Sequence, residues 1–184
     1  MIPTENSPIP DLNPLIIPLV TTSTRPEETF YLGRRLARLL ERGSIVALRG
    51  PLAAGKTCFV KGIAVGLGIK EEVTSPTYNI ISEYQGIISD ENFPLDSCDM
   101  QPGDLKSNGM KSHRIPVPVY HIDAYRLNGD DDLSAIGGVE IIFGKGISLV
   151  EWSERIPGFI PAWAIKVDFE ITGANERRIS IYRK

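Results

Sequence analysis

Cysteine and histidine are scarce in this chain of 184 residues, which contains two of each. The two cysteines, Cys58 and Cys98, do not form a CxxC pair. Two isolated thiols build no disulfide framework and do not supply the ligands of a structural zinc site. We therefore expect both thiols to be reduced.

Long apolar segments are also missing from the sequence. The longest early run, residues 15–20, is interrupted by Pro18 and is far too short to cross a bilayer. The N-terminus lacks the basic residues that open a signal peptide, since the first of them is Arg25. The sequence predicts a cytoplasmic protein without membrane attachment.

An excess of positive charge is absent as well. The chain has 20 basic and 23 acidic residues, which gives a net charge of −3. A strongly basic surface, which would hold nucleic acid by its phosphates, is therefore not expected. A role connected with RNA would instead be exercised through a partner protein. The composition, 42% apolar and 23% charged, is that of an ordinary globular protein.

The chain length fits one domain with a hydrophobic core. We interpret residues 1–14 as a flexible tail and residues 15–184 as the domain. Residues 86–116 have little periodicity and are interpreted as a flexible insertion. Residues 15–20 are predicted to be a short edge strand, because a proline cannot donate to a sheet.

Helical and strand patterns alternate through the rest of the domain. Thr24 and Glu27 have the spacing of a capping box before a helix that Gly43 ends. A second helix is expected from about residue 56 to 67, where Gly62 and Gly66 would allow close packing against a sheet. Further strands are expected at residues 45–48, 78–84, 117–122 and 147–150, and a closing hairpin at 164–171 and 177–182.

The segment Gly50-Pro51-Leu52-Ala53-Ala54-Gly55-Lys56-Thr57 matches the phosphate-binding pattern GxxxxGK[ST] in full. A continuous apolar run precedes it and a helical pattern follows, as a P-loop requires. Glycines let the loop bend so that successive N–H groups face an anion at the positive end of the helix. Lys56 would then contact the β- and γ-phosphates and Thr57 would ligate Mg²⁺. The loop predicts binding of ATP or a closely related nucleotide.

Two acidic residues end apolar strands downstream of this loop. Asp123 follows residues 117–122 and Glu151 follows residues 147–150. Strand ends of this kind line the ligand-binding crevice of α/β sheets, so either acid could support Mg²⁺ directly or through water. Thr77, which follows a proline in the next loop, could contact the γ-phosphate or the metal as a switch residue does.

Together these motifs resemble the TsaE family of bacterial ATPases, which act in the biosynthesis of threonylcarbamoyladenosine in tRNA. Besides the P-loop, the resemblance rests on Ser75-Pro76-Thr77-Tyr78, on residues 121–126 (HIDAYR) and on residues 149–152 (LVEW). Their order and approximate spacing match the family from about residue 19 to residue 182.

The resemblance implies a single α/β P-loop NTPase domain. Its central sheet would be mixed and mostly parallel, flanked by helices and closed by a C-terminal β-hairpin. It also implies work with the subunits TsaB and TsaD, in which ATP hydrolysis resets the complex that modifies the adenosine beside the anticodon. The transfer chemistry would belong to the partner.

The resemblance assigns roles to individual residues. Mg²⁺ would be held by Thr57 and Glu151, Asp123 would be poised over the attacking water or the second metal shell, and Thr77 would be the switch hydroxyl. Lys56, Asp123 and Thr77 are thus the expected catalytic residues. Trp152 and Arg126 would flank the site. Nucleotide contacts are expected from Gly50, Leu52, Ala53, Ala54, Gly55, Lys56 and Thr57, with adenine near Pro26, Glu27 and Gly173.

This chain departs from the family pattern at several positions. Ala53 stands where relatives often have glycine, so a positive φ there would strain the loop and slow hydrolysis. The insertion has no counterpart in short family members and could alter partner docking. His121 is interpreted as structural packing beside the site.

Two other functions are compatible with a P-loop. A small-molecule or nucleoside kinase would usually carry an arginine-bearing lid, and the insertion holds only Arg114. A nucleotide-dependent binding module would retain partner binding without hydrolysis. The accessory ATPase of a tRNA-modifying assembly is the leading hypothesis.

Overall fold

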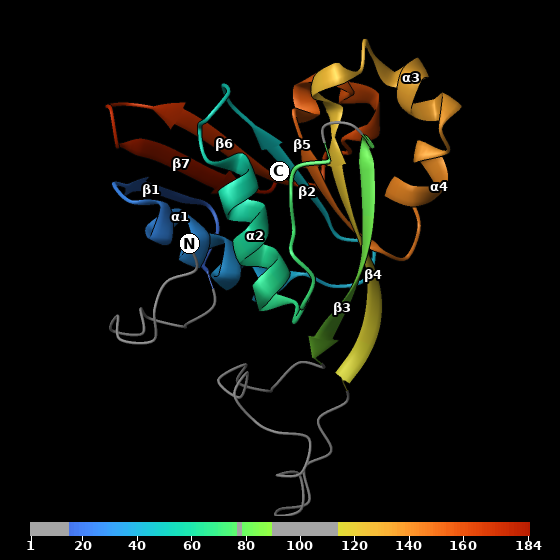
Figure 1. Ribbon diagram of the computed structural model, residues 1–184, viewed down its shortest axis with the longest axis horizontal. Coiled ribbons are helices and arrows are strands. Elements are labelled where there is room, and N and C mark those ends of the chain that lie inside the picture. The colour runs from blue at the N-terminus through green and yellow to red at the C-terminus, as the bar shows by residue number, and fades with distance from the viewer. Residues whose placement is uncertain (1–14, 77–78, 90–113) are drawn as a thin grey trace, which may run out of the picture.

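A computed structural model describes residues 15–76, 79–89 and 114–184 of the chain. Within these ranges the structure has a seven-stranded sheet with strand order β1-β7-β6-β2-β5-β4-β3 (Figure 1). The strands are β1 Leu19–Ser23, β2 Ile45–Arg49, β3 Ile81–Ser89, β4 Arg114–Asp123, β5 Ile147–Glu151, β6 Ile165–Ile171 and β7 Arg177–Tyr182. The α-helices are α1 Pro26–Leu36, α2 Lys56–Gly66, α3 Asp130–Ala135 and α4 Gly138–Ile142, and short 3-10 turns occupy Ala37–Leu39, Ala124–Arg126, Ser153–Arg155 and Pro157–Phe159.

The four central strands, β6, β2, β5 and β4, are parallel to one another. The outer strands β1, β7 and β3 pair antiparallel with their neighbours, and β6 and β7 form the C-terminal hairpin. The predicted fold, a mixed α/β sheet with flanking helices and a closing hairpin, is confirmed. It places the C-terminal ends of β2, β4 and β5 at one edge of the sheet.

The ends of several predicted elements need correction. The edge strand β1 lies at 19–23 rather than 15–20. Strand β3 begins at 81 rather than 78 and runs to 89, paired with a β4 that begins at 114. Residues 86–89 and 114–116 are therefore strand rather than insertion, and residues 90–113 lie outside the described ranges.

Both faces of the sheet are covered by apolar side chains, as the continuous apolar sequence of β2 requires. Val46 and Leu48 belong to a core with residues of α1 and α2. Ile45 faces the opposite way, into a second core with Leu133 of α3 and Ile142 of α4. Figure 1 shows these two pairs of helices well separated.

Helices α1 and α2 pack on each other so closely that only glycine fits at positions along their contact. A Cβ added at Gly62 would overlap the carbonyl oxygen of Phe30, and one at Gly66 would lie 2.5 Å from the Ala37 Cβ. The prediction that these glycines pack against the sheet was wrong, because their partners lie on α1 and the turn after it.

The start of α1 also differs in detail from its prediction. The backbone N–H and hydroxyl of Thr24 both donate to Glu28 Oε2, at 2.7 and 3.2 Å. Glu28, one residue after the expected Glu27, therefore closes the first turn. Of the helices described, none has the length and apolar character needed to cross a membrane.

Candidate functional site

The loop between β2 and α2 has the backbone of a phosphate-binding loop. Gly50 and Gly55 have φ angles of +137° and +104°, which glycine adopts without steric cost. A Cβ at Gly50 would also lie 2.6 Å from the carbonyl oxygen of Phe169 on β6. Glycine is thus required at Gly50 for both conformation and space, and α2 begins at Lys56 with its N-terminal end facing the loop.

Ala53 occupies the third position of this loop that needs a positive φ, at +59°. The expectation that a positive φ here would strain the loop therefore applies to this chain, because alanine meets steric resistance there. The neighbouring Leu52 is 73% exposed. Arg177 Nη2 donates to the Ala53 carbonyl at 3.4 Å.

Lys56 is held inside the loop, with 5% of its surface exposed. Its Nζ donates to the carbonyl oxygens of Gly50 and Pro51, at 2.7 and 2.8 Å, and lies 3.9 Å from the centre of the Trp152 ring. Burial lowers the pKa of Lys56, and the nearby Glu151 carboxylate partly opposes this. The ammonium is thus positioned at the loop without a direct carboxylate partner among the described contacts.

Thr57 and Glu151 meet across the mouth of the loop. The Thr57 hydroxyl donates to Glu151 Oε2 at 3.0 Å, and Glu151 is 3% exposed. The second carboxylate oxygen, Oε1, lies 2.9 Å from His121 Nε2. The predicted pair of magnesium-supporting residues is therefore brought together, although 94 positions separate them in the sequence.

Asp123 lies beside Glu151, because the two residues are register partners at the ends of β4 and β5. Its Oδ2 accepts from the Ser75 hydroxyl at 2.6 Å and its Oδ1 from the Tyr125 N–H at 3.0 Å. The backbone N–H of Asp123 also donates to the Ile80 carbonyl at 2.9 Å. Asp123 thus ties the loop before β3 to the site, while Thr77 lies outside the described residues.

The positions expected near adenine are divided between two places. Pro26 and Glu27 line a groove of about 670 Å³ that also contains Thr57 and Cys58. Gly173 lies on the β6–β7 turn, where its carbonyl accepts from Arg177, the residue that also reaches Ala53. Both places adjoin the phosphate loop, one through Thr57 and one through Arg177.

The donor set around Thr57 suits Mg²⁺. A hydroxyl and a carboxylate are hard oxygen ligands, and Mg²⁺ is usually bound through one or two carboxylates together with phosphates and water. Among the described residues there is no group of three or more Asp, Glu, His and Cys side chains that would form an all-protein metal cage. The residues present therefore fit a metal ion that enters with a nucleotide.

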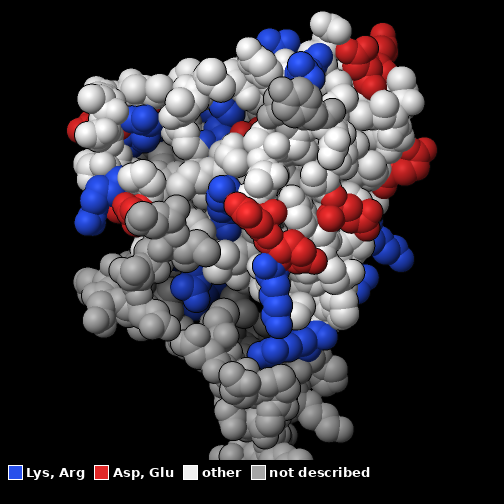
Figure 2. Space-filling model, in the orientation of Figure 1, with Lys and Arg blue, Asp and Glu red and all other residues white. Residues whose placement is uncertain are grey.

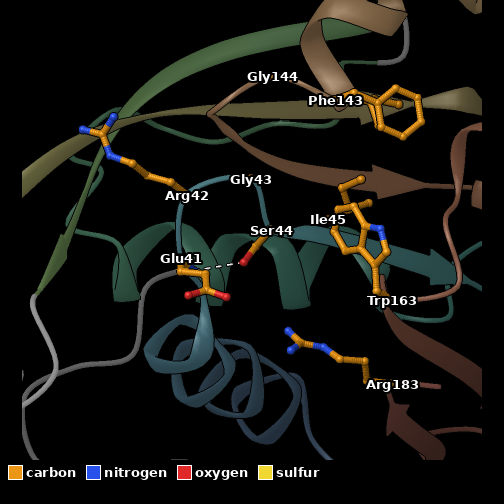
Figure 3. A pocket seen from close by; sticks show the side chains of 10 residues that line it. Glu41, Arg42, Gly43, Ser44, Ile45, Phe143, Gly144, Trp163 and Arg183 are labelled. Carbon is orange, nitrogen blue, oxygen red and sulfur yellow. Dashed lines mark hydrogen bonds between the residues drawn. The ribbon is translucent and has the colours of Figure 1, made fainter.

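A second cavity, of about 470 Å³, lies at the opposite edge of the sheet (Figure 3). Its lining includes Ser44 and Ile45 at the start of β2, Phe143 after α4 and Trp163 before β6. These residues precede the parallel strands, whereas ligands of α/β sheets bind beyond the carboxyl ends. The phosphate loop and both acids are at that other edge.

On the face of the molecule in Figure 2, Asp and Glu side chains lie mostly on the right half, whereas Lys and Arg side chains are spread over both halves. The groove beside Thr57 is lined by charges of both signs, Lys61 and Lys70 together with Glu71 and Glu72. The visible face thus carries both signs of charge, in a chain whose net charge is −3.

Sequence reasoning missed two parts of the site. His121 was interpreted as packing, but it contacts Glu151 and is completely buried. Its position two residues before Asp123 on the same strand was the available signal, because such residues share a face. Trp152 was expected only to flank the site; its contact with Lys56 depends on a backbone φ of +57°, which no sequence pattern indicated.

This chain is similar to known proteins over most of its length. The family model described as "Threonylcarbamoyl adenosine biosynthesis protein TsaE" matches residues 23–100 and 107–179. The protein of that family from Treponema pallidum is 35% identical over 159 residues, which cover 86% of this chain and 96% of the relative. The Bacillus subtilis protein is 32% identical over 158 residues, 86% of this chain and 81% of the relative.

A solved structure has the same fold. The crystal structure of Bacillus subtilis YdiB superposes with a TM-score of 0.60 at 30% sequence identity, covering 89% of this chain and 83% of the other. The match of the family model over most of the chain, together with these relatives, establishes the family. This chain belongs to the TsaE family of threonylcarbamoyl adenosine biosynthesis proteins.

Proposed function

We propose that this protein is an ATPase that binds ATP with Mg²⁺ and hydrolyses it as an accessory subunit in threonylcarbamoyladenosine biosynthesis. The observation that carries the proposal is the 3.0 Å contact between the Thr57 hydroxyl and the buried Glu151 carboxylate at the mouth of the loop. A carboxylate beside the hydroxyl that ends a P-loop motif is the arrangement that P-loop NTPases use to hold Mg²⁺.

The phosphates would lie in the concave face of the loop. The backbone N–H groups of residues 50–57 and the N-terminal end of α2 would bind them, and Lys56 would place its ammonium on the β- and γ-phosphates. Thr57 and Glu151 would hold the metal, whose positive charge neutralises the phosphates when bound. Pro26, Glu27 and Gly173 are proposed to lie near the adenine.

Asp123 is proposed to orient the attacking water, with Thr77 as the hydroxyl that senses the γ-phosphate. Two hydrogen bonds, from Ser75 and from the Tyr125 N–H, fix both oxygens of the Asp123 carboxylate in place. A water held by this carboxylate would be oriented without further rearrangement, which is the main contribution that a protein makes to phosphoryl transfer.

The partners proposed are TsaB and TsaD, with tRNA reached through that assembly. The chain has a net charge of −3 and so no excess of positive charge to hold phosphates; we therefore propose no direct tRNA contact. The cytoplasmic location expected from the sequence stays a prediction.

Reconstitution tests this function. The chain would be combined with TsaB, TsaD, tRNA, threonine, bicarbonate and ATP, and modified tRNA would be counted per complex. Omission of the chain, or Lys56→Ala, should abolish multiple turnovers, and Asp123→Asn and Glu151→Gln should slow them together with ATP hydrolysis. Unchanged turnover on omission would contradict the proposal.

The same experiment separates the two alternatives. If the Lys56, Asp123 and Glu151 variants lose hydrolysis but retain turnover, the protein is a binding module. If radiolabelled γ-phosphate appears on a small molecule rather than as free phosphate, the protein is a kinase.

A further inference from the structure

His121 contacts Glu151, one of the two proposed metal ligands. It lies on β4, is completely buried, and has its register partner at Leu149 on β5. Its side chain reaches diagonally along the sheet to Glu151, two residues further along β5, with 2.9 Å between Nε2 and Oε1. A histidine buried only to fill space would not need this alignment with a carboxylate.

The hydrogen bond fixes which ring nitrogen carries a proton. An ionised carboxylate only accepts hydrogen bonds, so His121 Nε2 must donate to Glu151. The other ring nitrogen, Nδ1, is buried and has no hydrogen-bond partner among the described residues. A lone pair at Nδ1 is tolerated there more easily than an unsatisfied N–H, which again places the proton on Nε2.

The contact also fixes the orientation of the Glu151 carboxylate. With Oε1 held by His121, the carboxylate plane is set and Oε2 faces the Thr57 hydroxyl at 3.0 Å. Without His121, Oε1 would be buried without this donor and the carboxylate could turn away from Thr57 to find another. Partners behind a ligand commonly set its orientation in this way.

We propose that His121 is a positioning residue that holds Glu151 by Oε1, so that Oε2 is presented beside Thr57 to the Mg²⁺ that accompanies a bound nucleotide. This inference rests on the proposed function for the metal, and it does not require that the nucleotide be hydrolysed.

The test compares three side chains at position 121 that differ in length and in their ability to donate a hydrogen bond. Gln can place its NH₂ near the position of Nε2, whereas Asn is one methylene shorter and Leu has no donor. For each full-length variant, binding of the non-hydrolysable ATP analogue AMP-PNP is measured by calorimetry in EDTA and across a Mg²⁺ titration. Ser148→Ala is the matched control, because Ser148 is a buried polar residue of β5 on the opposite face.

We expect His121→Asn and His121→Leu to raise the Mg²⁺ concentration for half-maximal binding about 10-fold or more, the usual effect of losing a partner behind a metal ligand. His121→Gln and Ser148→Ala should stay within about twofold of the native protein, and affinity in EDTA should be unchanged throughout. A native midpoint in His121→Leu or His121→Asn, or an equal shift in His121→Gln, overturns the inference.

If the variants fail to fold, NMR of the native protein tests the inference by showing which ring nitrogen of His121 carries the proton. The chain has two histidines, so the nitrogen NMR signals of the buried one can be assigned by comparison with a His113→Gln variant. A proton on Nε2 is expected, and a proton on Nδ1 alone overturns the inference. If AMP-PNP binding to the native protein does not depend on Mg²⁺, the proposed metal site itself is wrong. Every variant should then show the same independence of Mg²⁺.

Discussion

Ala53 has a backbone conformation that its side chain opposes. A left-handed φ costs an L-residue about 1 kcal/mol or more relative to the right-handed region, and Ala53 lies at +59°. Ala53→Gly should therefore raise the free energy of unfolding by up to about 1 kcal/mol, measured by urea denaturation. Ala54→Gly is the matched control, because Ala54 is buried and has no positive φ; it should lower the same quantity. A destabilised Ala53→Gly would contradict the interpretation of strain.

The Thr57 hydroxyl gives a second prediction for a single residue. Thr57→Ala removes the group that faces Glu151, whereas Thr57→Ser retains it. We expect Thr57→Ala to weaken Mg²⁺ in the nucleotide complex by about 10- to 100-fold and to slow hydrolysis, with Thr57→Ser close to native. Steady-state hydrolysis against Mg²⁺ concentration measures both effects. Equal defects in the two variants would show that the methyl group, not the hydroxyl, is what the site needs.

The residues named by motif were easier to predict than the contacts between them. Thr57, Asp123 and Glu151 could be selected from the sequence because each ends a strand or a phosphate motif. The link from Glu151 to His121 could not, since it requires the parallel pairing of β4 and β5 in one particular register. The same register places Asp123 beside Glu151.

Among the elements, α1 and α2 depend on glycine at their contact. Gly62→Ala would drive a methyl group into the Phe30 carbonyl, and overpacking of this kind costs about 1–3 kcal/mol. Thermal and urea unfolding should show that loss. Val65→Ala on the same helix, at a side chain that is 40% exposed, should change stability by no more than about 0.5 kcal/mol. Alanine favours a helix more than glycine does, so a Gly62→Ala variant as stable as the native protein, or more stable, would contradict the close approach.

The hairpin of β6 and β7 gives a prediction of how the free energy of unfolding depends on pH. Burial, and then the hydrogen bond to Asp168, raises the pKa of Tyr182 above its ordinary value of 10.0, and the hydroxyl lies 2.8 Å from Asp168 Oδ2. Above that value the folded state keeps a proton that the unfolded state has released. The contribution of Tyr182 to stability is therefore complete below pH 10.0 and is lost as the pH rises through the folded pKa.

Tyr182→Phe tests this dependence. The variant should be less stable at pH 8 by about 1 kcal/mol, the net worth of one hydrogen bond. The difference in free energy of unfolding between the native protein and the variant should decrease as the pH rises beyond 10.0. Because Tyr120, whose pKa is also raised, is present in both proteins, the difference between their unfolding curves isolates Tyr182. A difference in free energy of unfolding that increases with pH would contradict the stabilising role given to the protonated Tyr182 hydroxyl.

Element types were more predictable than element partners. Periodicity and the P-loop motif indicated β2, α2 and the closing hairpin nearly to the residue. The same patterns did not show that α2 packs on α1 through Gly62, because a glycine in a helix signals close approach without naming what approaches. They also did not show β3 running to Ser89, since pairing with β4 extends a strand whose own sequence has weak periodicity.

For the molecule as a whole, the sheet explains why distant motifs converge. Strands β2, β5 and β4 are parallel neighbours, so the segments that follow them, beginning at Gly50, Trp152 and Ala124, emerge at the same edge. The order of the strands along the chain does not indicate which strands are neighbours in the sheet. Strand β2, for example, lies between β6 and β5, and neither is adjacent to it in the sequence. Parallel strands require long crossovers, so strands that are neighbours in the sheet can be far apart along the chain.

Nucleotide binding should stabilise this whole molecule, because the loop joins β2 and α2 and contacts β6 through Gly50. A ligand that binds only the folded state at about 100 times its Kd adds about 2.7 kcal/mol to the free energy of unfolding. We expect this gain for the native protein with AMP-PNP and Mg²⁺, measured by urea denaturation. Lys56→Ala should lose most of it at the same concentration, since the ammonium that would contact the phosphates is absent. Loss of the gain in Ser148→Ala as well would point to general loosening of the sheet, and an equal gain in Lys56→Ala would place the nucleotide away from the loop at residues 50–57.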